Sequence, residues 1–359
     1  MLTELICQVR NRVRTQDSAS GLKTNTRTPE MCAIWASCKT RQEEDTLGPS
    51  DERRIAAPRI YTDLAARCTK LPGGFLDFDT DCNVIVHREE TDWSLSPAQT
   101  RLSIRCAFGG QRRFEIDRRT YVVDDTAYLL LNLGQIVRSS VTARAPVECL
   151  NVTFRPGFAE EALAAETAPI DKLLDDPLAY GKPVGFFVRT YPHNDSLSRR
   201  LLSLRTTLTS QPVTQAWLEE QFHHLASDLL QTHVRERLEM EGMPGARLST
   251  RIECYERLHS AREYMRACMG KPLMLSEISG VACMAPHHFL RTFKQAFRQT
   301  PHQYLTQLRL ERARTLLLRT DTPVTDICME VGFESLGSFS WLFSKRFRKS
   351  PTAFRTAGR

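Results

Sequence analysis

The feature that most limits how this chain can fold is a sequence repeat near its C-terminal end. Residues 289–304 read FLRTFKQAFRQTPHQY, and residues 339–354 read FSWLFSKRFRKSPTAF. At an offset of 50 residues the identical pairs are Phe289/Phe339, Phe293/Phe343, Phe297/Phe347, Arg298/Arg348 and Pro301/Pro351. A short helix signal, LSEISGVA or VTDICMEVGF, precedes each copy. Each unit therefore reads as a short helix, a turn, a longer basic helix and a proline that opens another helix, which is a helix-turn-helix arrangement.

Helical phase divides the longer helix of each copy into two faces. At about 100° per residue the phenylalanines fall on one stripe, and most polar and basic residues fall on the opposite side. We therefore expect the phenylalanines in the core and a basic outer face that suits the major groove of DNA. The residues expected to contact DNA are His287, His288, Arg291, Lys294, Gln295, Arg298, Gly337, Ser338, Ser340, Trp341, Lys345, Arg348 and Lys349.

These side chains differ in the contacts that their chemistry allows. Arg291 can bind the O6 and N7 atoms of guanine, whereas cations at the helix ends suit phosphates. Trp341 lies opposite the phenylalanine stripe, which favours packing on sugars or thymine methyl groups over a place in the core. For His287 and His288, a surface position without base contact is an equal alternative.

The charge distribution agrees with a polyanionic partner. Residues 255–359 hold 17 Lys+Arg against 8 Asp+Glu, while the other 254 residues hold 32 against 34. The positive charge thus belongs to the last part of the chain, and its segments 286–309 and 335–359 contain no acid. Two basic segments of this kind are typical of a nucleic-acid footprint, with an ordinary solvated charged face as the alternative.

The repeated segments, with RLHSAREYM before them and the Gly332-Phe333 pair between them, resemble the DNA-binding domain of AraC/XylS-type transcription regulators over residues 255–355. The resemblance implies two helix-turn-helix motifs bridged by one long helix at 301–319, double-stranded DNA as partner, and RNA polymerase as a second partner. Arg298 and Arg348 stand where the family usually has glycine. Leu290 replaces a common polar residue, and Trp341 a common arginine.

Upstream of this region the sequence predicts an α+β fold with three parts. Residues 1–56 are polar and aperiodic, and we interpret them as a poorly ordered extension. From 57 to 154 the pattern is strand-like: RLSIRCAF places Leu102, Ile104, Cys106 and Phe108 on one face, and Gly109-Gly110 reads as a hairpin turn. Helices follow at 197–208 and 213–239, and GMPG at 242–245 is the predicted linker. Residues 57–245 are thus one domain and 246–359 the next, whose first helix we expect Ser249 or Thr250 to cap.

The first domain resembles, more weakly, the cupin-like β-barrel that senses effectors and dimerises in the same family. His87 lacks the neighbours of a metal-binding cupin motif, so no metal is expected, and the barrel reads as an apolar pocket for a small molecule. The residues of that pocket are unknown from the sequence. The apolar stripe of 213–239 predicts a homodimer interface, or alternatively a face that docks on its own β-domain.

The remaining observations exclude other classes of protein. No apolar run is long enough to span a membrane, and eleven cysteines without a CxxC pair indicate reduced thiols in a cytoplasmic protein. We find no catalytic set and expect no cofactor. The function predicted is therefore a sequence-specific transcription regulator with a small-molecule sensor. The alternatives are a regulator or architectural DNA binder without an effector and, less favoured, a cupin-like enzyme fused to a DNA-binding domain.

Overall fold

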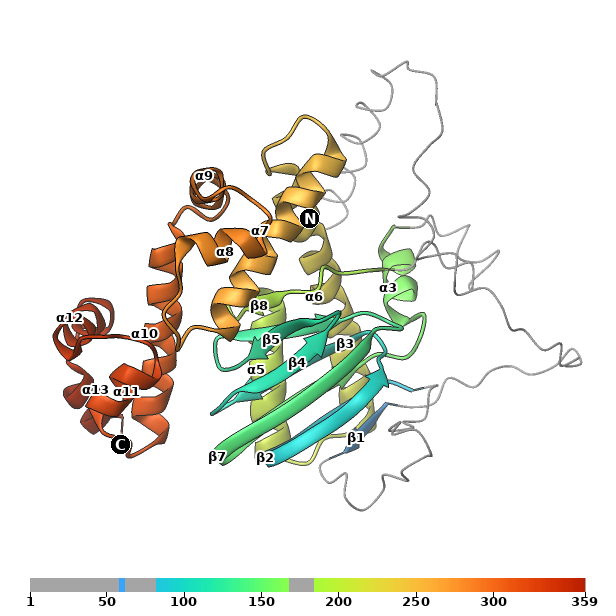
Figure 1. The fold of residues 1–359 in the computed structure, drawn as a ribbon. Coiled ribbons are helices and arrows are strands. Elements are labelled where there is room, and N and C mark those ends of the chain that lie inside the picture. Colours follow the sequence, from blue (N-terminus) through green and yellow to red (C-terminus); the bar gives the residue numbers. More distant parts are fainter. Residues whose placement is uncertain (1–57, 62–81, 168–183, 359) are drawn as a thin grey trace, which may run out of the picture. The chain divides into compact units, whose positions relative to one another are not determined.

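The computed structural model describes residues 58–61, 82–167 and 184–358, all of which lie in one compact unit, Ala57–Arg359 (Figure 1). The extension predicted for residues 1–56 lies outside the described residues. A β-rich N-terminal region is followed by a helical C-terminal region, in agreement with the predicted class. No described helix combines the length and the hydropathy needed to cross a bilayer.

The N-terminal region is built on one eight-stranded, barrel-like sheet. Its path runs β1-β2-β7-β3-β6-β8, and β4 joins it by pairing with β7 and β5. The strands are β1 (Arg59–Tyr61), β2 (Val84–Gln99), β3 (Ser103–Phe108), β4 (Arg112–Ile116), β5 (Arg119–Val123), β6 (Ala127–Leu131), β7 (Ile136–Thr153) and β8 (Thr190–Pro192). Where the structure describes the predicted strand region 57–154, at residues 58–61 and 82–154, the strands are confirmed, and β8 adds a strand from beyond it.

The Gly109-Gly110 prediction is wrong in its topology, because β3 and β4 do not form a hairpin. Both strands pair with β7, β3 along its C-terminal part and β4 along its N-terminal part. The glycines lie between β3 and β4, where the chain moves from the C-terminal part of β7 to its N-terminal part. Gly109 has φ +77°, and a Cβ on Gly110 would lie 2.3 Å from Cγ2 of Val147. The two-residue hairpin lies instead at Asp117-Arg118, between β4 and β5, where φ is 49° and 63°.

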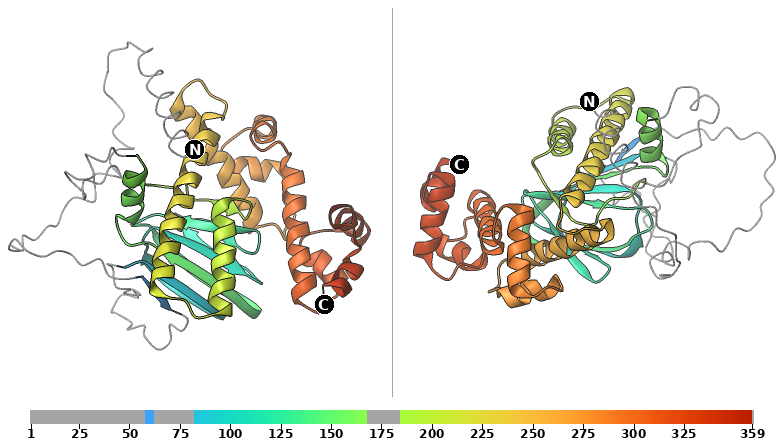
Figure 2. Two further views of the ribbon diagram at one scale, coloured as in Figure 1. Left: turned by 180° about the vertical axis from the view of Figure 1, so that it is seen from behind. Right: turned by 90° about the horizontal axis from the view of Figure 1, so that it is seen from above.

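Two apolar faces of the sheet follow from the alternation of its strands. The RLSIRCAF residues Leu102, Ile104, Cys106 and Phe108 share one cluster with residues of three helices, as their alternation predicted. These helices are α3 (Phe158–Thr167), α5 (Ser196–Ser210) and α6 (Gln215–Glu241), and Figure 2 shows α5 and α6 lying on one side of the sheet. The opposite, inner face carries a second cluster that includes Phe114, Val123 and Leu129.

The apolar stripe of α6 is buried against its own sheet. Leu225 and Leu229 are 0% exposed and pack in the same cluster as Ile104 and Leu150 of the sheet. The placement of a dimer interface on this stripe is therefore wrong, and the alternative interpretation, docking on the β-domain, holds. An apolar stripe on a helix indicates that the stripe is buried, but not which segment or subunit covers it, because periodicity is a local property.

The C-terminal region is built from helices that differ in length, from 7 to 20 residues. They are α7 (Leu248–Ala267), α8 (Leu275–Val281), α9 (Pro286–Phe297), α10 (Pro301–Arg319), α11 (Val324–Glu330), α12 (Leu336–Phe347) and α13 (Pro351–Ala357). The first half of α10 packs in a core with α7–α9, and its second half in a core with α11–α13. The bounds predicted for the long helix are confirmed. The cap predicted for α7 is wrong, since its N-cap is Arg247, without a side-chain hydrogen bond.

Candidate DNA-binding surface

The helix pairs α8–α9 and α11–α12 share the same local backbone. In each pair the short helix ends in a left-handed residue, Cys283 with φ 50° and Gly332 with φ 93°. The next residue then donates its amide to a carbonyl of the short helix: Met284 to Ser279 and Phe333 to Cys328, both at 3.0 Å. The sequence repeat thus corresponds to a repeated turn.

Each longer helix also ends in the same way. Arg298 follows α9 with φ 56°, and Arg348 follows α12 with φ 60°, both in the left-handed region. Thr300 and Ser350 then cap the next helices through their hydroxyl groups, ahead of a proline at the first turn. Glycine adopts this backbone at the lowest cost. The structure therefore explains why the family resemblance places glycine at both positions.

Helical phase predicted the two faces of α9 and α12 correctly. Phe289, Phe293, Phe339 and Phe343 are fully buried. Trp341 is 62% exposed, with the ammonium of Lys345 at 4.9 Å from its ring centroid, so it is not a core residue. Of the other residues expected to contact DNA, Ser340 is half-buried and the rest are exposed: His287, His288, Arg291, Lys294, Gln295, Arg298, Gly337, Ser338, Lys345, Arg348 and Lys349.

The exposed cations of this set have no acidic partner among the residues that the structure describes. Within the described ranges, no carboxylate forms an ion pair with Arg291, Lys294, Arg298, Lys345, Arg348 or Lys349. Nearby arginines outside the set do have such partners: Arg346 lies 3.2 Å from Glu311, and Arg314 lies 3.3 Å from the same carboxylate. The outer faces of α9 and α12 therefore carry positive charge that the described protein leaves uncompensated.

The end of α9 has a second neighbour that the sequence did not predict. Gln295 and Arg298 line a cavity of about 470 Å³ together with residues of β8 and α6, among them Arg235, and with Asp195 at the start of α5. These two predicted DNA contacts therefore face the N-terminal region as well as solvent. The residues of α12 in the set do not line this cavity.

A buried polar junction joins α7 to the N-terminal region. Arg266 lies 3.1 Å from Asp124, which follows β5 in the chain. Glu263 accepts the amide and the hydroxyl of Thr190 of β8, at 2.8 and 2.9 Å. Sequence analysis missed this junction, because charged residues on an amphipathic helix ordinarily mark its solvent face.

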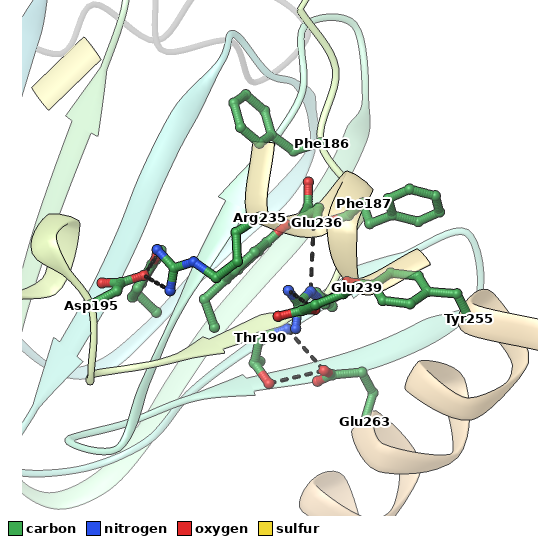
Figure 3. A network of polar contacts seen from close by, with 12 residues as sticks. Phe186, Phe187, Thr190, Asp195, Arg235, Glu236, Glu239, Tyr255 and Glu263 are labelled. Atoms are coloured by element: carbon green, nitrogen blue, oxygen red, sulfur yellow. Dashed lines mark hydrogen bonds and ion pairs between the residues drawn. The ribbon is translucent and has the colours of Figure 1, made fainter. Parts of the chain in front are cut away.

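The junction continues onto α6, as Figure 3 shows around Glu236, Glu239 and Tyr255. Arg189 lies 3.0 Å from the Glu239 carboxylate, which also accepts the Tyr255 hydroxyl at 2.9 Å. Tyr191 donates its hydroxyl to Glu236. Burial raises the pKa of Glu236 to about 7, although Arg189 and the Tyr191 hydrogen bond act to lower it. A carboxyl group of α6 is therefore poised to change charge near neutral pH.

Most cysteines in the described part of the chain are buried, and His87 contacts a carboxylate. Cys106, Cys149, Cys254 and Cys328 are buried free thiols, and burial raises the pKa of Cys149 and Cys328. His87 lies 2.8 Å from Glu148, and no described group of three His, Cys, Asp or Glu could hold a metal ion.

Comparisons with known proteins agree with the geometry of the helical region. The helix-turn-helix domain family matches residues 278–357. The probable transcriptional regulator LumQ of Photobacterium leiognathi is 28% identical over 153 residues, covering 38% of this chain and 61% of that protein. The HTH-type transcriptional activator RhaS of Enterobacter sp. is 30% identical over 169 residues, covering 46% of this chain and 58% of that protein. The chain thus spans about three fifths of the length of these relatives.

Among solved structures, a transcriptional regulator with an AraC-type DNA-binding domain from Chromobacterium violaceum is 30% identical. It covers 29% of this chain and 93% of its own, with a TM-score of 0.28. The family match lies on the segment that holds both helix pairs and α10, and the relatives are named as transcription regulators. The helical region therefore carries the helix-turn-helix domain of AraC/XylS-type transcription regulators, as its repeated segments predicted.

Proposed function

We propose that the protein is a sequence-specific DNA-binding transcription regulator that acts in the cytoplasm. In this proposal α8–α9 and α11–α12 are two helix-turn-helix motifs, and α9 and α12 enter adjacent segments of the major groove. The cupin-like N-terminal region senses a small molecule, the regulator works as a homodimer, and RNA polymerase is its partner at the promoter. The proteins that it resembles over its helical region support this role.

The observation that carries the proposal is the set of exposed cations on α9 and α12 that form no ion pair with the described part of the chain. A protein surface that keeps its arginines free of carboxylates leaves their charge available to phosphates, and neutralising phosphates releases counterions from DNA. Arg291 lies mid-helix on the outer face, where a bidentate contact to guanine is sterically open. Arg348 lies at the helix end, where a phosphate is the nearer partner.

The long helix α10 and its neighbours hold the two motifs together. Arg309 of α10 donates to the carbonyls of Met269 and Lys271, both at 2.8 Å. Gly332 lies against the same carbonyl, since a Cβ there would be 2.7 Å from the Met269 oxygen. This close approach fixes the second motif against the chain that leads into the first. Two reading helices on a rigid support favour an extended, specific site over scattered contacts.

The experiment that tests the proposal is selective retention of duplex DNA by the full chain. Binding sites selected from random duplexes should share a sequence, and affinity should fall steeply as salt rises. The double variant Lys345→Gln/Arg348→Gln, at the end of α12, should bind more weakly and with a salt slope flatter by about two phosphate contacts. Arg257→Gln, which removes a cation already paired with Glu253, is the matched control. Retention that is equal for all sequences would support the architectural alternative, and no retention at low salt would refute both.

A further inference from the structure

The inner face of the sheet carries an arginine in an unusual position. Arg105 is in the middle of β3, an internal strand that pairs with both β6 and β7. Its side chain lies on the face opposite Ile104 and Cys106, the face of Ser103 and Ala107. Those two neighbours are fully buried, whereas Arg105 is half-buried. The guanidinium therefore reaches past the buried layer of the sheet toward accessible space on its inner side.

Two further guanidinium groups lie on the same face. Asn151 is the cross-strand partner of Arg105, and it accepts a hydrogen bond from Nη1 of Arg112 at 2.9 Å. Arg112 also donates through Nε to Ser139 at 2.7 Å. Arg88 and Arg112 both stack on the ring of Trp93, with their guanidinium carbons 4.6 and 5.0 Å from its centroid. The inner face is therefore not the purely apolar pocket that the sequence predicted.

The charges of this cluster are incompletely balanced by the protein that the structure describes. Arg88 pairs with Glu90. No described carboxylate pairs with Arg105 or Arg112, and the buried Nε of Arg105 has no hydrogen-bond acceptor among the described residues. Burial lowers the pKa of Arg105 to about 9, with the positive charges of Arg112, Arg101 and Arg88 acting in the same direction. A buried cation without an anion is costly, so such a site favours an anionic ligand.

We propose that Arg105, with Arg112 beside it, binds the anionic group of a small organic molecule on the inner face of the sheet. The ligand carries a carboxylate or a phosphate, because the planar donors of a guanidinium match either group in a bidentate geometry. The apolar side chains of the same face, including Ala107 and Phe114, contact its carbon part. This inference rests on the proposed sensing role and assigns the chemical class of the sensed molecule.

The test uses the full chain and matched probes. Phenylacetate and phenyl phosphate supply the two anionic groups, and phenylacetamide is the neutral counterpart of the first. Titration calorimetry should show saturable binding of at least one anion, and binding of the amide at least about tenfold weaker, as expected for loss of a charged hydrogen bond. The stronger of the two anions identifies the group that the site prefers. Saturable binding of neither anion, or equal binding of the amide, refutes the proposal.

A variant separates the site from unspecific binding. Arg105→Met removes the charge and keeps an unbranched side chain, so binding of the anion should weaken about tenfold or more. The same variant should raise the melting temperature of the unliganded chain, because it removes a half-buried cation that no described carboxylate pairs with. Arg113→Met, on the exposed side of β4, should change neither value. Unchanged anion binding in Arg105→Met, or a lowered melting temperature without ligand, contradicts the proposal.

Duplex retention measured on the same preparations separates this inference from the proposed function. If the protein retains DNA selectively but binds no anion, only the anion site is refuted. If the protein binds the anion through Arg105 but retains no DNA, the anion site is supported and the regulator role is refuted.

Discussion

Arg266 of α7 donates to the carboxylate of Asp124 at 3.1 Å, and the two side chains are only 6% and 7% exposed. The same guanidinium donates to the hydroxyl of Thr126 at 2.8 Å. Asp124 in turn accepts the amide of Thr126, which fixes the turn between β5 and β6. This ion pair therefore ties α7, the helix that precedes the two helix pairs, to a turn of the N-terminal sheet.

Replacing one member of this pair should destabilise the whole unit. Arg266→Met leaves the Asp124 carboxylate buried without its cation, and we expect the free energy of unfolding to fall by about 3–5 kcal/mol. Urea denaturation followed by circular dichroism measures this loss. Arg257→Met, on the same helix but paired with Glu253 at the surface, should cost less than about 1 kcal/mol. Similar losses for both variants would show that the buried pair has no special role.

The stability of the protein should depend on pH through Glu236. Its pKa of about 7 lies above the ordinary value of 4.5, so the folded state holds a proton that the unfolded state releases between these values. The contribution of Glu236 is therefore fully present below pH 4.5 and is lost as pH rises through 7.

Glu236→Gln abolishes this titration. Between pH 5 and 8 the variant should lose less unfolding free energy than the parent, by about 1–3 kcal/mol. Burial lowers the pKa of His193 and His233 to about 4, so these histidines make the unfolding free energy rise with pH below 6.5. This contribution is the same in the variant and the parent. The control is Glu220→Gln, which removes an exposed carboxylate of α6. Parallel pH profiles for Glu236→Gln and the parent would contradict this assignment.

The left-handed arginines that end α9 and α12 predict a stabilising substitution. Glycine adopts φ near 60° without the strain of a Cβ atom, so Arg348→Gly should raise the free energy of unfolding by about 0.5–1 kcal/mol. Arg291→Gly, in the interior of α9, should instead lower it by about 1 kcal/mol. Chemical denaturation of the two variants checks the difference in sign. Two losses of equal size would mean that the αL backbone at Arg348 is not strained.

DNA selectivity should separate the same two positions. Arg291→Ala should cost about 1–3 kcal/mol at one base pair and relax the preference there, since a bidentate contact to guanine would be lost. Arg348→Ala should weaken all duplexes about equally, because a phosphate contact carries no base identity. Binding to the selected site and to its single-base variants measures both effects. An equal loss on selected and random duplexes for Arg291→Ala would assign Arg291 to phosphate.

The sequence by itself determined the helical region in detail. The phenylalanine spacing placed Phe289 and Phe339 in the core and Arg291 on the surface, whereas the bounds of α10 came from the family resemblance of the repeated segments. These features are local: residues three or four positions apart share a helix face, and a proline sets the start of a helix within one turn. The alternation of β3 was predictable for the same reason.

Only the tertiary structure decided which surfaces meet. The stripe around Leu225 could face a second subunit or its own sheet, and Gly110 could turn a hairpin or make room for Val147. Arg266 and Asp124 are separated by 142 positions, and no local pattern relates them. The inner face around Arg105 likewise became visible only once the strands were paired. The spacing of apolar residues indicates that a helix or strand face is covered, and the sequence shows which residues are charged. The partner of such a face or charge depends on contacts between segments distant along the chain.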